Sequence, residues 1–183
     1  MLLHYLKYII EVLLSPNNGW KDVKESTDAP QELLSGAFYP LLGIEAVAAL
    51  VCGLVYGHGL GRALTEAIIL FGSYFGALFV ARLVLYTYIP KIEGTADRDV
   101  PDRLALVMLG LMSLFNTLTL VLPWKLLILK FLPIYGALVV SAPDARALVD
   151  VPRANYMRFI LVAVCATVAA PMVIYNLFYL LLP

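Results

Sequence analysis

Apolar residues fill most of the chain in long runs, and short polar connections separate these runs. A helix needs about 20 mostly apolar residues to cross the hydrocarbon of a bilayer. Five segments meet or nearly meet this length, and the fourth is the shortest. The pattern predicts transmembrane helices over residues 33–56, 63–89, 104–122, 124–140 and 158–182.

Proline and capping residues support these boundaries. Asp28 and Pro30 are suited to the start of the first helix, while Pro90 and Pro123 follow the second and third. The connections are short, which favours antiparallel packing of sequence neighbours. We therefore expect an all-α polytopic membrane bundle that forms one domain over residues 1–183.

The first 14 residues, MLLHYLKYIIEVLL, also have a helical pattern. His4, Lys7 and Glu11 form a narrow polar stripe, and leucine and isoleucine fill most of the other positions. The segment is too short to span a bilayer, and its internal charges are not typical of a signal peptide. The pattern predicts an amphipathic helix lying in the membrane interface. The alternative is a helix buried against the end of the bundle.

The next residues predict how this helix ends. Ser15 and Pro16 are expected to stop it, and residues 17–19 to turn the chain. Trp20 and Lys7 are then expected at the level of the lipid headgroups.

Composition agrees with a membrane location. Hydrophobic residues make up 62% of the chain, charged residues only 14%, and the mean hydropathy is +0.87. The formal net charge is zero, so no nucleic-acid partner is expected. Cys52 and Cys165 lie in apolar runs and are expected to pack as small hydrophobic residues.

The Lys and Arg residues predict the orientation. Cytoplasmic ends of membrane helices are enriched in them, and with five spans one side holds about three times as many as the other. The rich side includes the N-terminus, so the N-terminus is expected in the cytoplasm and the C-terminus outside. The rich side carries Lys7, Lys21, Lys24, Lys91, Arg98, Arg103, Arg146, Arg153 and Arg158, and the other side carries Arg62, Lys125 and Lys130.

Several charged residues lie within the predicted spans. An ionisable group there costs about 2.5–3.5 kcal/mol on insertion scales, so it needs a partner or a wet cavity. Glu45 lies in the middle of the first span, and Arg82 in the second is a candidate partner. Glu66 and Lys130 form a second candidate pair. Each pair either orients helices or, in the sharper alternative, belongs to a site that moves a proton or a substrate.

The third span adds Ser113 and Asn116, one turn apart. Such groups commonly hydrogen-bond between helices, and the alternative is a ligand contact. The sequence contains no His-Glu-x-x-His metalloprotease motif, no Gly-x-Ser-x-Gly hydrolase motif and no P-loop. We therefore expect a non-enzymatic protein with no catalytic residues, no metal site and no cofactor.

The overall layout resembles the Yip family of five-span membrane proteins, the Ypt/Rab-interacting group and its bacterial relatives. The resemblance rests on LLSPNNGW at residues 13–20 and on WKLLILKFLPIYGALVVSAPDARALV at residues 124–149, which are similar to bacterial members. Eukaryotic members carry Asp-Leu-x-Gly-Pro before the first span, where this chain has STDAPQELLSG, so the resemblance does not carry Rab binding over.

The resemblance implies five spans, a cytoplasmic N-terminus, no enzymatic activity and, for a bacterial-type member, the inner membrane. It favours a scaffold or adaptor in membrane organisation or in protein and lipid trafficking, with the bilayer, other membrane proteins or a second copy as partners. The alternative is a small transporter or lipid-handling protein that uses Glu45 and Arg82.

Overall fold

The computed structural model describes residues 1–95, 97–122 and 131–181, and within these ranges the chain is helical with no β-strand. Four helical segments are long and apolar enough to cross a membrane: Pro30–Val55, Leu60–Ile92, Asp99–Val121 and Arg153–Leu181. Each coincides with one of the predicted spans. These four helices indicate an integral membrane protein, in agreement with the composition.

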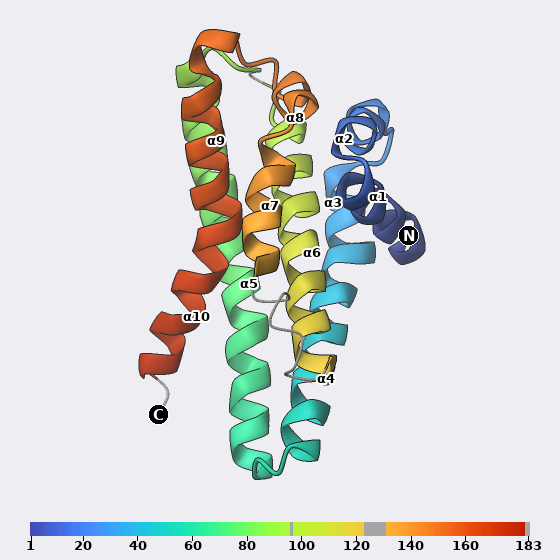
Figure 1. Ribbon diagram of the computed structural model, residues 1–183, viewed down its shortest axis with the longest axis vertical. Helices are drawn as coiled ribbons and strands as arrows, with labels where there is room; N and C mark the ends of the chain where they lie inside the picture. The colour runs from blue at the N-terminus through green and yellow to red at the C-terminus, as the bar shows by residue number, and fades with distance from the viewer. Residues whose placement is uncertain (96, 123–130, 182–183) are drawn as a thin grey trace.

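The four long segments run roughly parallel to the long axis of the molecule (Figure 1). The turn between α4 (Tyr39–Val55) and α5 (Leu60–Tyr88) lies at the lower end of Figure 1, and α8 (Pro143–Leu148) lies near the upper end. Three of the four segments are assembled from more than one element. The elements are α3 (Pro30–Leu33), a π-helical turn (Leu34–Phe38), α4 (Tyr39–Val55), α5 (Leu60–Tyr88), a 3-10 turn (Pro90–Ile92), α6 (Asp99–Val121), a second 3-10 turn (Arg153–Asn155), α9 (Tyr156–Val164), a second π-helical turn (Cys165–Ala169) and α10 (Ala170–Leu181).

Each π-helical turn ends two residues before a proline. Leu34–Phe38 comes before Pro40, and Cys165–Ala169 comes before Pro171. Proline has no N–H to donate and its ring crowds the preceding turn. A wider turn accommodates this defect without breaking the helix. The first and last spans are therefore continuous but locally widened.

Small residues set the packing of α5. Its buried face includes Ala63, Ala67, Ala77 and Ala81 at helical spacing, while its phenylalanines mostly face outward. Small side chains let membrane helices approach closely. Gly53 of α4 shows this directly, because a Cβ there would lie 3.0 Å from the Cβ of Ala63.

The predicted fourth span, 124–140, is described only in part. Residues 123–130 lie outside the described residues, and α7 (Leu132–Val140) has 9 residues. It lies beside the upper half of α6 (Figure 1). Pro133 is in its first turn, where proline is tolerated, so this proline begins the helix. The short helix α8 (Pro143–Leu148) follows.

The N-terminal region contains two helices where the sequence predicts one helix and a turn. α1 covers Leu2–Leu14 as predicted, but α2 covers Pro16–Glu25 and includes the residues predicted to turn. The error has a physical reason: Pro16 occupies the first turn of a new helix and does not merely end the old one. Gly19 then serves close packing, because a Cβ there would lie 2.5 Å from the Cα of Val12.

α1 and α2 pack on the side of the bundle next to α3 and away from α9 and α10 (Figure 1). Tyr5, Ile9 and Val12 of α1 are fully buried against it. Leu3 and Leu14 point away from the bundle and are 84% and 76% exposed. α1 therefore has one apolar face that the protein covers and further apolar residues that it leaves open.

Candidate functional site

Glu45 lies on the buried face of α4, one turn from Leu41 and Ala49. Residues four apart share one face of a helix, so the carboxyl group points into the bundle, toward α6. Its Oε2 accepts a hydrogen bond from Ser113 Oγ at 2.5 Å, and its Oε1 accepts one from Asn116 Nδ2 at 2.8 Å. We call Glu45, Ser113 and Asn116 the Glu45 cluster.

Arg82 does not reach this cluster, which corrects the candidate pair Glu45–Arg82. α4 and α5 are antiparallel, and Tyr74 of α5 lines the same hollow as Asn116 of the cluster. Arg82 lies eight residues farther along α5, about 12 Å at 1.5 Å per residue. Its Nε and Nη2 instead donate to the two carboxylate oxygens of Asp102 on α6, at 2.8 and 2.7 Å.

The Glu45 cluster is a carboxyl site without a cation. No ion pair among the described residues includes Glu45, and its side chain is completely buried. A buried polar group is costly unless it is hydrogen-bonded, and here both carboxyl oxygens accept a hydrogen bond from α6. The arrangement joins α4 to α6. In the described ranges no group of three metal-ligating side chains is present.

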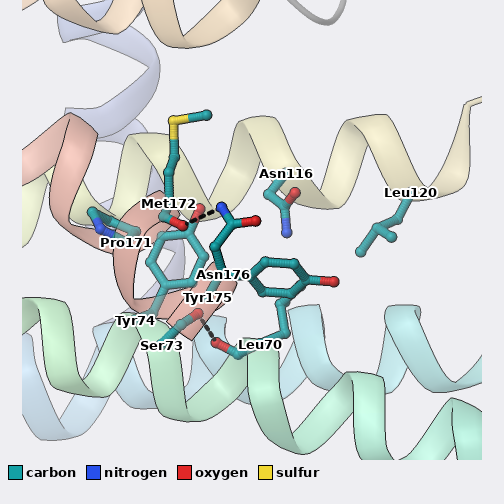
Figure 2. Close-up of a pocket in the computed structure, with 9 residues that line it drawn as sticks. All are labelled: Leu70, Ser73, Tyr74, Asn116, Leu120, Pro171, Met172, Tyr175 and Asn176. Carbon is teal, nitrogen blue, oxygen red and sulfur yellow. Dashed lines mark hydrogen bonds between the residues drawn. The ribbon is translucent and has the colours of Figure 1, made fainter. Parts of the chain in front are cut away.

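A hollow of about 280 Å³ opens beside the Glu45 cluster, between α5, α6 and α10. Figure 2 shows Asn116 and Leu120 projecting from α6 above the side chains of α5. Asn116 therefore belongs both to the cluster and to the wall of the hollow, whereas Glu45 does not line it. The widened turn Cys165–Ala169 precedes the stretch of α10 that forms the remaining wall and includes Pro171.

Glu66 lies near the lower end of the bundle and has two partners other than the one predicted. Its Oε1 is 3.2 Å from Nε of Arg62, and its Oε2 is 3.4 Å from Nδ1 of His58. Lys130, the predicted partner, lies outside the described residues. Glu66 and Arg62 line a second hollow, of about 640 Å³, between α5 and α10.

The upper end carries a separate structure formed by α1, α2 and α8, which we call the platform. Trp20 of α2 is fully buried, and its Nε1 donates to the carbonyl oxygen of Val139 at 3.0 Å. The expectation that Trp20 contacts lipid headgroups is thereby corrected, because α2 carries the indole onto α7. Lys7 stays at the surface, 3.4 Å from Glu11.

Tyr5 attaches α1 to the middle of α6. Its hydroxyl donates to the carbonyl oxygen of Leu106 at 2.6 Å. The phenol ring lies against Gly110, where a Cβ would come within 2.9 Å of Tyr5 Cζ. Burial raises the pKa of Tyr5 well above its usual range, so the hydroxyl stays a donor at physiological pH.

Arg103 and Lys24 hold the rest of the platform through main-chain carbonyl groups. Nη1 of Arg103 donates to Ser26 O at 2.7 Å, and Nη2 donates to Asp28 O at 3.2 Å. Nζ of Lys24 donates to Ala147 O of α8 at 2.6 Å. These long-range contacts fix α2 and the chain after it relative to α6 and α8.

The structure thus joins only some of the residues singled out in the sequence. Glu45, Ser113 and Asn116 form one cluster, while Arg82 and Glu66 lie elsewhere with other partners. Tyr5 and Asp102, by contrast, have partners in the structure that the sequence pattern did not predict. Gly110 on α6 could have indicated the contact with Tyr5, because a glycine within an apolar helix commonly marks a position where another helix approaches closely.

No protein-family model matches the chain, and neither the curated proteins nor the solved structures include a match to it.

Proposed function

We propose that this protein is a non-enzymatic membrane scaffold or adaptor of Yip-like layout, which presents the platform to another membrane protein or to a second copy of itself. The observation that carries this proposal is the way the platform is held. α1 and α2 are fixed to α6, α7 and α8 by side chains that bond to main-chain carbonyl groups, while charged side chains of α2 face outward.

The outward side of α2 supports a docking role. Lys21, Asp22 and Glu25 are exposed, on a helix whose other face carries the buried Trp20 and Val23. A rigidly held helix with both charge signs on its free face is suited to specific recognition, since complementary charges select partners and set orientation. A flexible terminal segment would need no such anchoring.

The Glu45 cluster supports the same conclusion. Its carboxyl group is buried, hydrogen-bonded on both oxygens and outside both hollows. A proton-carrying or substrate-binding carboxyl group needs access to a wet path. The alternative, a transporter that uses Glu45 together with Arg82, is weakened because each side chain has its own separate partners.

The proposed topology has five crossings, with residues 124–140 forming the fourth, and places the platform in the cytoplasm of a bacterial cell. The charge distribution supports it. Among the described residues, the upper end carries Lys7, Lys21, Lys24, Lys91, Arg98, Arg103, Arg146, Arg153 and Arg158, and the lower end carries Arg62. In this topology the exposed leucines of α1, Leu3 and Leu14, meet the membrane interface.

Site-specific crosslinking in native membranes tests the scaffold proposal. A photo-crosslinking amino acid placed at Lys21 or Glu25 is expected to give a discrete protein adduct, identified by mass spectrometry. The matched control is Val55, which is 75% exposed at the opposite end of the bundle. The adduct is expected to disappear in a Trp20→Ala variant that releases α2. Adducts with lipid alone at both Lys21 and Glu25 would refute the proposal.

A further inference from the structure

Two hollows follow one another along the seam between α5 and α10. The outer one, about 640 Å³, begins at Arg62 and Glu66 near the lower end of the bundle. The inner one, about 280 Å³, begins at Leu70 and ends against Asn116 of α6. Ile69 lines the first and Leu70 the second, so the two are adjacent along α5.

Two tyrosines of α10 connect the hollows. Tyr179 lines the outer hollow and Tyr175 the inner one. Their rings are stacked, with centroids 6.3 Å apart and an interplanar angle of 17°. They form one aromatic wall along both hollows. We call the two hollows together the α5–α10 groove.

The outer end of the groove carries both charge signs. Arg62 uses only its Nε to bond Glu66 among the described residues, and its side chain is 63% exposed. The guanidinium therefore keeps its terminal N–H groups free of described protein partners. Glu66 is 23% exposed, and its two oxygens already lie near Arg62 and His58; each carboxylate oxygen has a further lone pair that a ligand can use.

The inner end combines apolar side chains with a few polar ones. Leu70, Leu120 and Met172 line it, together with the rings of Tyr74 and Tyr175. Two of its polar side chains donate to main-chain oxygens: Ser73 donates to Leu70 O at 2.8 Å, and Asn176 donates to Met172 O at 2.7 Å (Figure 2). Asn116 donates to Glu45. An acyl chain fits this environment.

The length of the groove fits one leaflet of a bilayer. Eight to twelve residues separate Arg62 from Leu70 and Tyr74, which is about 12–18 Å along a helix. Half of the hydrocarbon thickness of a bilayer is about 15 Å. The charged end therefore lies at headgroup level when the inner hollow lies near the bilayer centre.

We propose that the α5–α10 groove binds one phospholipid whose headgroup carries both a phosphate and a primary ammonium group. The phosphate bonds to the guanidinium of Arg62, and the ammonium group donates to the carboxylate of Glu66. One acyl chain follows Tyr179 and Tyr175 into the inner hollow. This occupant is favoured over an anionic lipid because Glu66 would repel a headgroup without a cation.

Lipid retention tests the proposal. The full chain is purified, stripped of lipid, and reconstituted in nanodiscs made from equal parts of phosphatidylethanolamine, phosphatidylcholine and phosphatidylglycerol. Lipid that stays bound after extraction into mild detergent is counted by native mass spectrometry. We expect one phosphatidylethanolamine per chain, retained at least fivefold over the other two lipids.

Paired variants locate the site. Thr65→Trp fills the outer hollow and is expected to lower the retained lipid at least fivefold, whereas Leu64→Trp, on an exposed neighbouring position of α5, is expected to leave it unchanged. Glu66→Gln is expected to remove the preference for phosphatidylethanolamine over phosphatidylglycerol. Thermal unfolding checks that each variant is folded.

Two outcomes would overturn the proposal. One is equal retention by Thr65→Trp and Leu64→Trp, which would indicate annular lipid only. The other is retention without headgroup preference in the unmodified chain. Neither outcome bears on the platform, because the groove lies at the opposite end of the bundle from α8.

Discussion

Glu45 shows what one buried side chain contributes to a membrane bundle. Its two hydrogen bonds from α6 satisfy both carboxyl oxygens, and no described cation is paired with it. We therefore expect the stability of the protein to depend on the hydrogen bonds of Glu45 and not on its charge. Substitutions that keep the hydrogen bonds can be compared with substitutions that remove them.

Glu45→Gln is expected to change the free energy of unfolding by less than about 1 kcal/mol, because an amide can still bond with Ser113 and Asn116. Glu45→Leu is expected to cost about 2–3 kcal/mol, since it leaves the polar groups of Ser113 and Asn116 without this partner. Denaturant titration in detergent micelles measures both. Equal losses in the two variants would show instead that the charge of Glu45 matters.

Gly110 sets the distance between α1 and α6. A Cβ at this position would lie 2.9 Å from both Tyr5 Cζ and Ile9 Cδ1. Gly110→Ala is therefore expected to destabilise the protein by about 1–3 kcal/mol through overpacking, and to speed hydrogen exchange of the α1 amides.

Gly43→Ala is the matched control for this prediction. Gly43 also lies within a spanning helix, but a Cβ there meets nothing within 4 Å. The substitution is expected to be neutral or to stabilise the helix by about 0.5–1 kcal/mol. Unchanged α1 exchange in Gly110→Ala would contradict the close approach of α1 to α6.

At the scale of elements, the Arg82–Asp102 pair connects α5 to the first turn of α6. The side chains are 23% and 12% exposed, and two parallel N–H···O bonds join them. Removing one member of a buried pair leaves an uncompensated charge, which is costly, whereas removing both is much less so. Because Arg82 and Asp102 are only partly buried, we expect the loss of either side chain to lower the free energy of unfolding by a moderate amount.

Asp102→Leu and Arg82→Leu are each expected to lower the free energy of unfolding by about 2–4 kcal/mol, and the double variant Arg82→Leu with Asp102→Leu by less than either. Lys7→Ala, which breaks an exposed pair with Glu11, is expected to change it by less than about 1 kcal/mol. A double-mutant cycle on thermal unfolding measures the coupling. Additive losses would show that the two side chains are independent.

At the scale of the whole molecule, the proposed topology places the two ends of the bundle on opposite sides of a membrane. In a background without Cys52 and Cys165, Lys21→Cys and Asp144→Cys are expected to react with an impermeant maleimide only after cells are permeabilised. Tyr56→Cys is expected to react in intact cells.

These positions also test the fourth crossing. Asp144 follows residues 124–140, whereas Val121 precedes them. If Val121→Cys reacts in intact cells and Asp144→Cys does not, the chain crosses the membrane between them. Labelling of both positions from the same side would leave four crossings and would contradict the proposed five-span layout.

Hydropathy alone was enough to predict the four long helices, because an 18-residue apolar run determines a span with little help from tertiary contacts. It did not predict which side chains meet. Glu45 and Arg82 were both recognisable as charged residues within spans. Their partners, however, depend on how far antiparallel helices are shifted along their axes relative to one another. Trp20 was misplaced for a related reason, since one proline was interpreted as an end where it begins α2.

Arg103 holds the segment after α2 by its main chain alone, through the carbonyl oxygens of Ser26 and Asp28. Every residue has a carbonyl oxygen, whichever side chain it carries. Substitutions in this segment can therefore alter the surface chemistry that a partner meets while the attachment persists. In evolutionary terms, recognition at this edge of the platform can diversify while the bonds from Arg103 are kept, and the cost includes the side-chain hydrogen bonds that Ser26 and Asp28 accept from Tyr8.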